Sequence, residues 1–429
     1  MPSSRAKSRK AILVVVDGLT ASTFEEAVGD RSAPTLTALA DAGEYRRAVT
    51  TFPSLTPVCL TSLVTGAHPD GHHIPHLVWW HRGQRRIVEY GSSFGAMRAA
   101  GARRSIRDTI VGMNAEHLSP DATTLYEDAE GAGLTAAAIN ITCYRAATRH
   151  VPTVPGLVPP VYGPKRFFYY SLFESDPIGA PLAIRNRAAG SVDDYAAAAA
   201  RWLVTRDGFD VLVYYLSDLD FASHVHGPKG VRAALGAADR QVRVLADAAG
   251  GLDELLDRYA LLLCSDHGQT AVSAGVVRLR EHIESGAVVT SSNRAAMIYG
   301  DDPRALAGSL DGVAGIDACC FLEEGEVIAR RRGDEDAALL DEHPGGHERV
   351  EAALRNPNAG DVLVSASEGW EFADLAGSHH LGGGSHGSLA AEDSLVPMLS
   401  VGAGEPPART IDVKDTLLAA LGVVHAETA

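Results

Sequence analysis

The chain has 429 residues and a formal net charge of −16, with 46% hydrophobic and 21% charged residues. This composition is typical of a globular protein, and the length predicts either one large domain with a sizeable insertion or two domains. The negative charge argues against nucleic acid as a bulk partner, because a phosphate backbone is bound mainly by lysine and arginine. The apolar run at residues 11–16 is too short for a signal peptide or a membrane span, so we expect a cytoplasmic protein without a membrane partner.

Three continuous apolar segments are predicted to be buried parallel strands: Ala11–Val16, Asp210–Leu216 and Tyr259–Cys264. Two stretches with helical character, Asp193–Val204 and Gly230–Ala248, precede the second and third strands. Strands that alternate with helices are typical of βαβ crossovers. We therefore predict an α/β fold with a doubly wound, mainly parallel central sheet, helices on both faces of the sheet, and a smaller inserted cap region.

The less regular tracts of the chain give the predicted domain boundaries. Residues 1–10 are predicted to be a disordered basic tail, residues 11–270 and 379–429 the catalytic α/β domain, and residues 271–378 an inserted cap or subdomain. The insertion contains charge-rich pieces such as RRRGDEDAALLDEH. We expect it to fold separately and to return the chain to the sheet.

Acidic and imidazole side chains follow each of the three predicted strands. They are Asp17 after the first strand, Asp218, Asp220 and His224 after the second, and Asp266 and His267 after the third. In open α/β sheets, ligands bind outside the carboxyl ends of the strands. One strand that ends in an aspartate is commonplace, as a cap or a turn. Three strands that all end in metal-capable residues predict a metal site at this edge.

Two local patterns add to this prediction. Asp220 and His224 are four residues apart, which is one helical turn, so both can face one ion. The alternative is a solvated polar loop, and Asp218 can also act as an acceptor that orients an imidazole. His386 lies in the glycine-dense sequence HHLGGGSHGSL, and glycines let a backbone approach an ion closely. The alternative there is a flexible surface loop.

The sequence TFPSLTPVCLTSLVTG predicts a turn followed by a short helix. Thr56 is expected as the N-cap, Pro57 at the first helical position and Gly66 as the C-terminal stop. A hydroxyl at a helix N-terminus lies beside unpaired N–H groups and the positive end of the helix dipole, which favour a phosphate. The alternative is that Thr56 is only a cap.

The charges of these residues indicate the class of ligand. Three aspartates, three neutral imidazoles and two divalent cations together carry a charge of about +1, which suits a phosphate ester. Mixed imidazole and carboxylate ligands favour Zn²⁺, with Mn²⁺ or Fe as alternatives. Two such ions can clamp the attacking and leaving oxygens of an in-line displacement and activate the Thr56 hydroxyl. The pattern predicts a two-metal phosphoester hydrolase with Thr56 as the nucleophile.

These motifs resemble those of the alkaline phosphatase superfamily, and most of all its nucleotide pyrophosphatase/phosphodiesterase branch, from residue 11 to about residue 400. The matching segments are VVVDG, TFPSLTPVCLTSLVTGAHPDGHHI, DFASHVHGP with Ser223 in place of a glycine, Asp266-His267-Gly268, and GSHG. The resemblance implies a phosphothreonine intermediate on Thr56, which also contacts both ions. It implies two ligand sets: Asp220, His224 and His386 for one ion, and Asp17, Asp266 and His267 for the other.

One departure from the family concerns the substrate. The branch has an asparagine downstream of the nucleophile that hydrogen-bonds a phosphate oxygen, and this position falls at or near Leu77. His76, the indole N–H of Trp79, or Asn114 can take its place, so these three are the candidate substrate contacts. The alternative for Trp79 is packing. Three other histidines have less definite interpretations: His226 as a bystander, and His379 and His380 as facing substrate or solvent.

The leading hypothesis is a phosphodiesterase or nucleotide pyrophosphatase that acts on a small phosphorylated substrate. A phosphomonoesterase or a phosphonate hydrolase uses the same groups. A metal-dependent phosphomutase is disfavoured because such enzymes usually carry a serine nucleophile and a dedicated sugar-phosphate domain. A non-catalytic binding homologue is disfavoured because none of the six ligands is missing. The natural substrate and the oligomeric state are left open at this stage.

Overall fold

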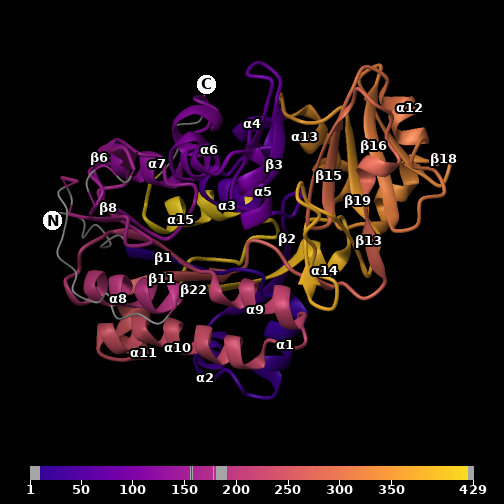
Figure 1. Ribbon diagram of the computed structural model, residues 1–429. Coiled ribbons are helices and arrows are strands. Elements are labelled where there is room, and N and C mark those ends of the chain that lie inside the picture. Colours follow the sequence, from indigo (N-terminus) through magenta and orange to yellow (C-terminus); the bar gives the residue numbers. More distant parts are fainter. Residues whose placement is uncertain (1–9, 155, 157, 177, 180–190, 424–429) are drawn as a thin grey trace.

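The computed structural model describes residues 10–154, 156, 158–176, 178–179 and 191–423. The predicted basic tail, residues 1–10, lies outside the described residues except for Lys10, which begins the first strand. Figure 1 shows two sheets with helices packed against them. No helix in the described part of the chain is long and apolar enough to cross a membrane.

The larger sheet has eight strands in the order β2-β22-β11-β1-β10-β5-β8-β9. Its centre is parallel, because β1 pairs in parallel with β10 and β11, and β5 pairs in parallel with β10 and β8. The outer pairings at both sides are antiparallel. The strands are β1 (Lys10–Val16), β2 (Glu44–Val49), β5 (Ala136–Ile139), β8 (Arg166–Tyr169), β9 (Phe173–Ser175), β10 (Val211–Leu216), β11 (Tyr259–Cys264) and β22 (Leu395–Val401). This confirms the doubly wound, mainly parallel α/β fold.

Two apolar cores cover the two faces of this sheet, and β1 contributes to both. Leu13 and Val15 belong to one core, whereas Ile12 and Val14 belong to the other, as expected for a strand buried on both faces. One face is covered by α3 (Thr56–Thr65), α7 (Leu125–Gly131) and α15 (Val413–Ala420). The other face is covered by α1 (Ala21–Gly29), α2 (Pro34–Ala42), α8 (Val192–Thr205), α10 (Arg232–Ala249) and α11 (Leu252–Arg258).

The second sheet has six strands and lies within the tract predicted as an insertion. Its order is β14-β15-β19-β16-β17-β18, and all of its pairings are antiparallel. The strands are β14 (Val288–Ser292), β15 (Ala295–Tyr299), β16 (Ile316–Glu323), β17 (Glu326–Arg331), β18 (Asp334–Glu335) and β19 (Val362–Ala366). The helices α12 (Pro303–Gly308) and α13 (Gly346–Arg355) accompany it (Figure 1).

Several short elements surround the edge of the larger sheet at which the site lies. They are α4 (Pro69–His72), β3 (Val78–His81), β4 (Arg86–Glu89), α5 (Phe94–Ala100), α6 (Ala102–Arg107), the π-helix η1 (Asp108–His117), α9 (Asp218–His226), β12 (Thr270–Ala271), β21 (Gly384–Ser385) and α14 (Ala391–Ser394). Smaller pairs complete the structure: β6 (Thr148–His150) with β7 (Val161–Gly163), and β13 (Gly275–Val277) with β20 (Trp370–Phe372). The remaining short helices are η2 (Leu279–Glu281), η3 (Ala337–Glu342) and η4 (Thr410–Asp412).

Candidate active site

The strands β1, β10 and β11 end side by side, which brings three separate parts of the sequence together. Val16 pairs with Leu216, and Val15 pairs with Cys264. The residues that follow these positions are the acidic and imidazole residues singled out in the sequence. His267 Nε2 lies 3.3 Å from Asp17 Oδ1 and 3.5 Å from Asp266 Oδ2, and all three side chains are buried. Their ligand atoms form one group that can hold a metal ion.

A second group forms beside the first, and His267 belongs to both. Asp220, His267 and His386 offer ligand atoms that all lie within 4.8 Å of one another. His386 Nε2 lies 3.9 Å from Asp220 Oδ1, and the rings of His267 and His386 stack with 3.6 Å between their centroids. His224 joins through its Nε2, which is 3.2 Å from Asp220 Oδ2. The structure therefore brings all six predicted ligands together.

The three imidazoles share one hydrogen-bonding pattern. In each ring Nδ1 lies at hydrogen-bond distance from a backbone carbonyl, which can only accept, so Nδ1 carries the proton. The carbonyls are Gly384 O for His224 at 2.9 Å, Gly268 O for His267 at 3.0 Å, and Ser54 O for His386 at 2.8 Å. The Nε2 lone pair of each ring is left for the cluster, as in a neutral histidine that ligates a metal.

The carboxylates in this site are buried without enough positive charge around them. Asp17 Oδ1 and Asp266 Oδ2 are buried and have no hydrogen-bond partner among the described residues. Burial, together with the neighbouring carboxylates of Asp266 and Asp220, raises the pKa of Asp17 well above its ordinary value. Burial also raises the pKa of Asp266. Divalent cations would remove both the desolvation cost and the repulsion, so these residues fit a metal centre.

Thr56 lies next to the residue that the two groups share. Its Oγ1 is 3.0 Å from His267 Nε2. The prediction that Thr56 is the N-cap of the helix is wrong, because Leu55 is the extended N-cap residue and Thr56 is the first helical residue. A side chain at that position does not reach back to the free N–H groups as an N-cap does, so the hydroxyl is available to the site. The helix ends at Gly66, which adopts the left-handed conformation with φ 69°, as predicted.

Three further residues at the site were not identified from the sequence. The Tyr215 hydroxyl donates to Asp17 Oδ2, and Gln269 Nε2 donates to Asp220 Oδ1. Asn293 Nδ2 lies 2.9 Å from His386 Nε2. Gln269 follows the Asp-His-Gly motif directly, and Tyr215 lies in a predicted strand, so their positions carried a signal. Asn293 lies in the turn between β14 and β15, far from any motif.

The structure does not bring the three candidate substrate contacts into the cavity above Thr56. The amide of Asn114 is used by the backbone, since Nδ2 donates to Thr142 O at 2.8 Å and Oδ1 accepts from Tyr144 N at 2.7 Å. His76 is buried, and its Nδ1 accepts from Val78 N at 3.0 Å. Trp79 is buried and stacks on His81. These contacts are packing and local backbone contacts.

The remaining polar residues divide between the site and the surface. His380 stacks on His224 with 4.1 Å between centroids and lines the cavity, whereas His379 is exposed. Asp218 does not orient an imidazole, because the three imidazoles are already held by backbone carbonyls. Its Oδ2 instead accepts from Asp193 N at 3.2 Å. His226 is exposed and lines a separate cavity.

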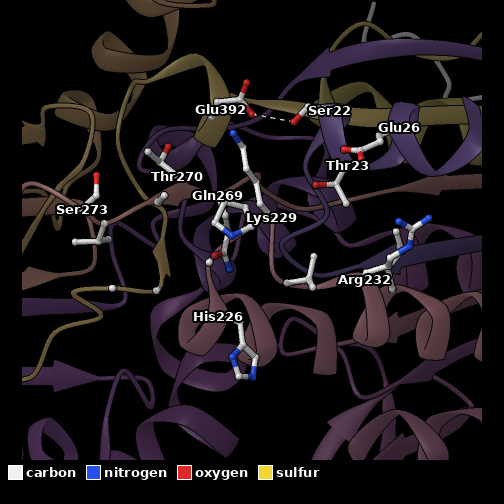
Figure 2. Close-up of a pocket in the computed structure, with 18 of the residues that line it drawn as sticks. Ser22, Thr23, Glu26, His226, Lys229, Arg232, Gln269, Thr270, Ser273 and Glu392 are labelled. Atoms are coloured by element: carbon white, nitrogen blue, oxygen red, sulfur yellow. Dashed lines mark hydrogen bonds between the residues drawn. The ribbon is translucent and has the colours of Figure 1, made fainter. Parts of the chain in front are cut away.

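Two cavities lie near these residues. A cavity of about 620 Å³ opens above Thr56 and is also lined by Asp17, Asp220, His224, Asn293 and His386. A larger one of about 1330 Å³, shown in Figure 2, is lined by Gln269, Lys229 and Arg232 among others, and its wall carries a 3.1 Å hydrogen bond from Ser22 to Glu392. None of the six predicted ligands lines the larger cavity. Of these two cavities, only the smaller one is lined by Thr56.

Residues 11–389 match the family described as type I phosphodiesterase / nucleotide pyrophosphatase. The chain belongs to this family. Type I phosphodiesterases hydrolyse phosphoric esters, and the chain is such a hydrolase. The match runs from β1 to the loop after His386 and so includes all the residues of the site. A search of curated proteins found no match.

Solved structures with the same fold include two hydrolases. The chain is 16% identical to murine ectonucleotide pyrophosphatase / phosphodiesterase 5, with a TM-score of 0.65, covering 97% of this chain and 96% of that one. An inactive threonine-to-alanine variant of the murine protein, in complex with AMP, gives a TM-score of 0.64. Phosphonoacetate hydrolase from Sinorhizobium meliloti, in complex with phosphonoformate, is 17% identical with a TM-score of 0.65, again covering 97% and 96%. At sequence identities this low, the likeness to these structures shows a shared fold and no more.

Proposed function

We propose that this member of the type I phosphodiesterase family hydrolyses a small phosphodiester or phosphonate monoester through Thr56. The observation that carries the proposal is the 3.0 Å contact between Thr56 Oγ1 and His267 Nε2. It places a hydroxyl beside the imidazole that belongs to both groups of candidate metal ligands. A hydroxyl in this position would lie next to the positive charge of the proposed cations, which would stabilise the negative charge of a phosphoryl group.

The residues of the site divide between metal binding and catalysis. Asp220, His224 and His386 are proposed to hold one divalent cation, and Asp17, Asp266 and His267 the other. The mixed nitrogen and oxygen donors favour Zn²⁺ over Mg²⁺ or Ca²⁺. When bound, such ions supply Lewis-acid charge for the phosphoryl oxygens.

Thr56 Oγ1 is the proposed nucleophile. A bond forms between this oxygen and phosphorus while the bond from phosphorus to the leaving oxygen breaks, and the first product departs as an alcohol. Thr56 then carries the phosphoryl group until water cleaves the new ester. Thr56 is also the first residue of α3, a ten-residue helix. Pro57 has no N–H, and the N–H groups of Val58 and Cys59 both donate to Leu55 O at 2.9 Å. Among the described groups at the start of this helix, the N–H of Thr56 itself is therefore the proposed donor to the phosphoryl group.

Asn293 is the proposed donor to a phosphoryl oxygen. Its Nδ2 now lies 2.9 Å from His386 Nε2, which is the ring nitrogen that a cation would take. With a cation held by His386 Nε2, the Asn293 amide would lose this acceptor and would be free to donate elsewhere. Asn293 lines the same cavity as Thr56, so an oxygen of the substrate is the natural new acceptor. In this way Asn293 fills the role that the sequence pattern assigned to a position at or near Leu77.

The charge of the cavity favours a singly charged ester over a phosphomonoester. The described lining residues include no lysine and no arginine, and two aspartates lie at the base of the cavity. With two divalent cations, the six ligands carry a charge of about +1. A phosphodiester or a phosphonate monoester carries one negative charge, whereas a phosphomonoester at neutral pH carries nearly two.

The proposal is tested by replacing the nucleophile while the metal centre is kept. We expect the Thr56→Ala variant to lose hydrolysis of bis-p-nitrophenyl phosphate by at least about a thousandfold, because the covalent route is removed. Elemental analysis should find the same metal content as in the wild-type protein. The Thr56→Ser variant, which keeps a hydroxyl, should retain part of the activity. Activity of Thr56→Ala near that of the wild type would rule out the nucleophile assignment.

A further inference from the structure

We infer that the substrate carries an uncharged, apolar organic group on its phosphorus, such as an aryl or alkyl group, and carries no carboxylate or second phosphate on that group. The inference rests on the proposed function, because it concerns the cavity above Thr56. That cavity has a volume of about 620 Å³. This is within the usual range of small-molecule sites and larger than a phosphoryl group requires.

The walls of the cavity are mainly apolar. The apolar and aromatic side chains that line it come from seven separate parts of the chain: Pro57 of α3; Leu77; Tyr90; Met97, Ile106, Ile110 and Met113 of α5, α6 and η1; Tyr169, Tyr170 and Leu172; Tyr215 of β10; and Phe221 and Val225 of α9. Covering the exposed parts of such side chains with an apolar ligand removes apolar surface from water, which is favourable. The walls therefore favour an apolar group over a solvated one.

The helix α9 shows how the apolar wall is joined to the metal centre. Asp220 and His224 lie four residues apart and face the cluster. Phe221 follows Asp220 and Val225 follows His224, so Phe221 and Val225 are also four residues apart and form a second stripe on the helix beside the first. Phe221 is 62% exposed and Val225 is 68% exposed, although both line the cavity. Exposed apolar side chains grouped beside a catalytic centre indicate a ligand-binding surface.

The aromatic part of the wall is held in a constrained backbone. Tyr170 and Ser171 adopt positive φ values of 45° and 56°, and so does Asn140 at 57°. The Tyr170 N–H donates to Asn140 Oδ1 at 2.8 Å, which fixes the turn. Such conformations are strained in residues other than glycine and cluster at ligand sites. The position of Tyr170 at the cavity is thus built into the fold.

An anionic substituent has no partner in this cavity. Among the described residues of the lining there is no lysine or arginine, and Asp17 and Asp220 lie at its base. A carboxylate or a second phosphate would lose its water without gaining a cation. The larger cavity of Figure 2 differs in this respect, since Lys229 and Arg232 both line it. The cationic side chains near the site therefore lie outside the cavity that opens on Thr56.

The test uses p-nitrophenyl esters that share one leaving group and differ in the group on phosphorus. The four substrates are the esters of methyl-, butyl-, phenyl- and carboxymethylphosphonic acid, assayed with the Zn²⁺-loaded protein. We expect kcat/KM to rise about fourfold for each methylene that the walls cover. The phenyl ester should be cleaved faster than the methyl ester, and the carboxymethyl ester at least about tenfold more slowly than the butyl ester. A carboxymethyl ester that is cleaved as well as the butyl ester overturns the inference but leaves the proposed function standing.

If none of the four esters is hydrolysed, the proposed function fails, and ligand binding then tests the inference alone. Isothermal titration of the Zn²⁺-loaded Thr56→Ala protein should show phenylphosphonate binding at least about tenfold more tightly than phosphonoacetate. Equal binding of the two, tighter binding of phosphonoacetate, or binding of neither would overturn the inference.

A pair of matched variants tests whether this wall contacts the substrate. Ile106 lines the cavity and is 44% exposed, so Ile106→Lys places a cation on the wall at little cost to folding. We expect its preference for the butyl over the carboxymethyl ester to fall at least tenfold relative to the wild type. Ile178 is 82% exposed and does not line the cavity, so Ile178→Lys adds the same charge elsewhere and should leave the preference unchanged. Identical preferences in both variants would overturn the inference.

Discussion

Each candidate ligand in the site is held by a second group that restricts its orientation. Backbone carbonyls fix the imidazoles through Nδ1, the Tyr215 hydroxyl donates to Asp17, the Gln269 amide donates to Asp220, and the Gly18 N–H donates to Asp266 Oδ1 at 3.4 Å. Loss of such supporting groups typically lowers metal affinity by about 10–100-fold. We therefore propose that these groups influence metal binding through the ligands that they orient.

Gln269 offers the sharpest test at this scale. Gln269→Leu keeps the size of the buried side chain but removes the donor to Asp220 Oδ1. We expect Zn²⁺ affinity, measured by competition with a chromophoric chelator, to fall by about 10–100-fold. Gln241→Leu is the matched control, because Gln241 donates to Asp194 away from the site. If both variants bind Zn²⁺ as tightly as the wild type, Gln269 has no positioning role.

The residues of the site differ in how far the sequence reveals them. Asp17 and His267 could be identified because residue type and position at a strand end both point to a ligand. Asn293 could not, since its role depends on a turn of the second sheet that packs beside His386. Asn114 and Trp79 were misleading for the opposite reason. Their side chains are of types that can contact a phosphate. In the structure, however, the Asn114 amide donates to a backbone carbonyl and the Trp79 ring packs against His81.

At the scale of elements, the start of α8 is joined to the junction between β10 and α9. Asp193 Oδ1 accepts from Ser217 N at 2.7 Å, and Asp218 Oδ2 accepts from Asp193 N at 3.2 Å. Burial and the neighbouring Asp218 raise the pKa of Asp193 to about 7. The first turn of α8 therefore contains a carboxyl group that ionises near neutral pH, beside the helix that carries Asp220.

The raised pKa of Asp193 makes the free energy of unfolding decrease as the pH rises. The pKa of Asp193 is higher in the folded state than in the unfolded state, so its contribution to stability is fully present below about pH 3.8 and is lost as the pH rises through about 7. Asp193→Asn keeps the acceptor and removes the ionisation. In urea unfolding we expect its free energy of unfolding to exceed that of the wild type by on the order of a few kcal/mol at pH 8, and by much less at pH 4.5.

Asp194→Asn is the control for this prediction. Asp194 lies in the same first turn of α8, so the variant loses the same favourable charge at the helix N-terminus. It should show no comparable gain between pH 4.5 and pH 8. A difference between Asp193→Asn and the wild type that stays constant across these pH values would contradict the account.

The elements themselves were predicted best where the apolar pattern was continuous. The three predicted core strands match β1, β10 and β11 within one residue at each end. The start of α3 was misplaced by one residue, because a threonine before a proline fits both the cap and the first helical position. Only the extended backbone of Leu55 decides between the two. Local preferences rarely fix a helix boundary more closely than this.

At the scale of the whole molecule, the second sheet is anchored beside the active site. The turn between β14 and β15 carries both Asn293 and Arg294. Arg294 N donates to His386 O at 2.8 Å, and the buried Arg294 guanidinium pairs with Asp393 at 3.3 Å. Asp393 also accepts from Thr270 and Ser388. Residues of the tract predicted as an insertion therefore contact the candidate site directly.

Arg294 should be important for stability because its partner is also buried. Arg294→Met leaves the Asp393 carboxylate buried without a cation, and we expect a loss of about 3–5 kcal/mol in the free energy of unfolding. Arg304→Met is the matched control, since Arg304 forms ion pairs with Glu323 and Glu335 at the surface and its loss should cost much less. Equal losses, measured by urea denaturation, would show that the buried pair does not anchor the second sheet.

The overall architecture was predictable only in part. Long apolar strands followed by ligand residues predict the parallel sheet and the edge at which the site lies. In the second sheet, β17 and β18 are rich in charged residues, and Arg330 pairs with Glu335 at the surface. The buried strands β15 (AAMIY) and β19 (VLVSA) are apolar runs of only five residues, and runs this short do not distinguish a strand from a segment of buried helix. The sequence therefore indicated an insertion but not a sheet. The contact of that sheet with His386 is a tertiary feature that no local pattern carries.

The central claim is that Thr56 carries the phosphoryl group during turnover, and mass spectrometry of the protein quenched in acid during turnover tests it most directly. The Zn²⁺-loaded enzyme is mixed with p-nitrophenyl phenylphosphonate, quenched, digested and analysed peptide by peptide. We expect a mass increase equal to the phenylphosphonyl group on the peptide that contains Thr56, and no such increase in the Thr56→Ala variant. Full turnover with no modified peptide under any quenching time, or modification of another residue, would contradict it.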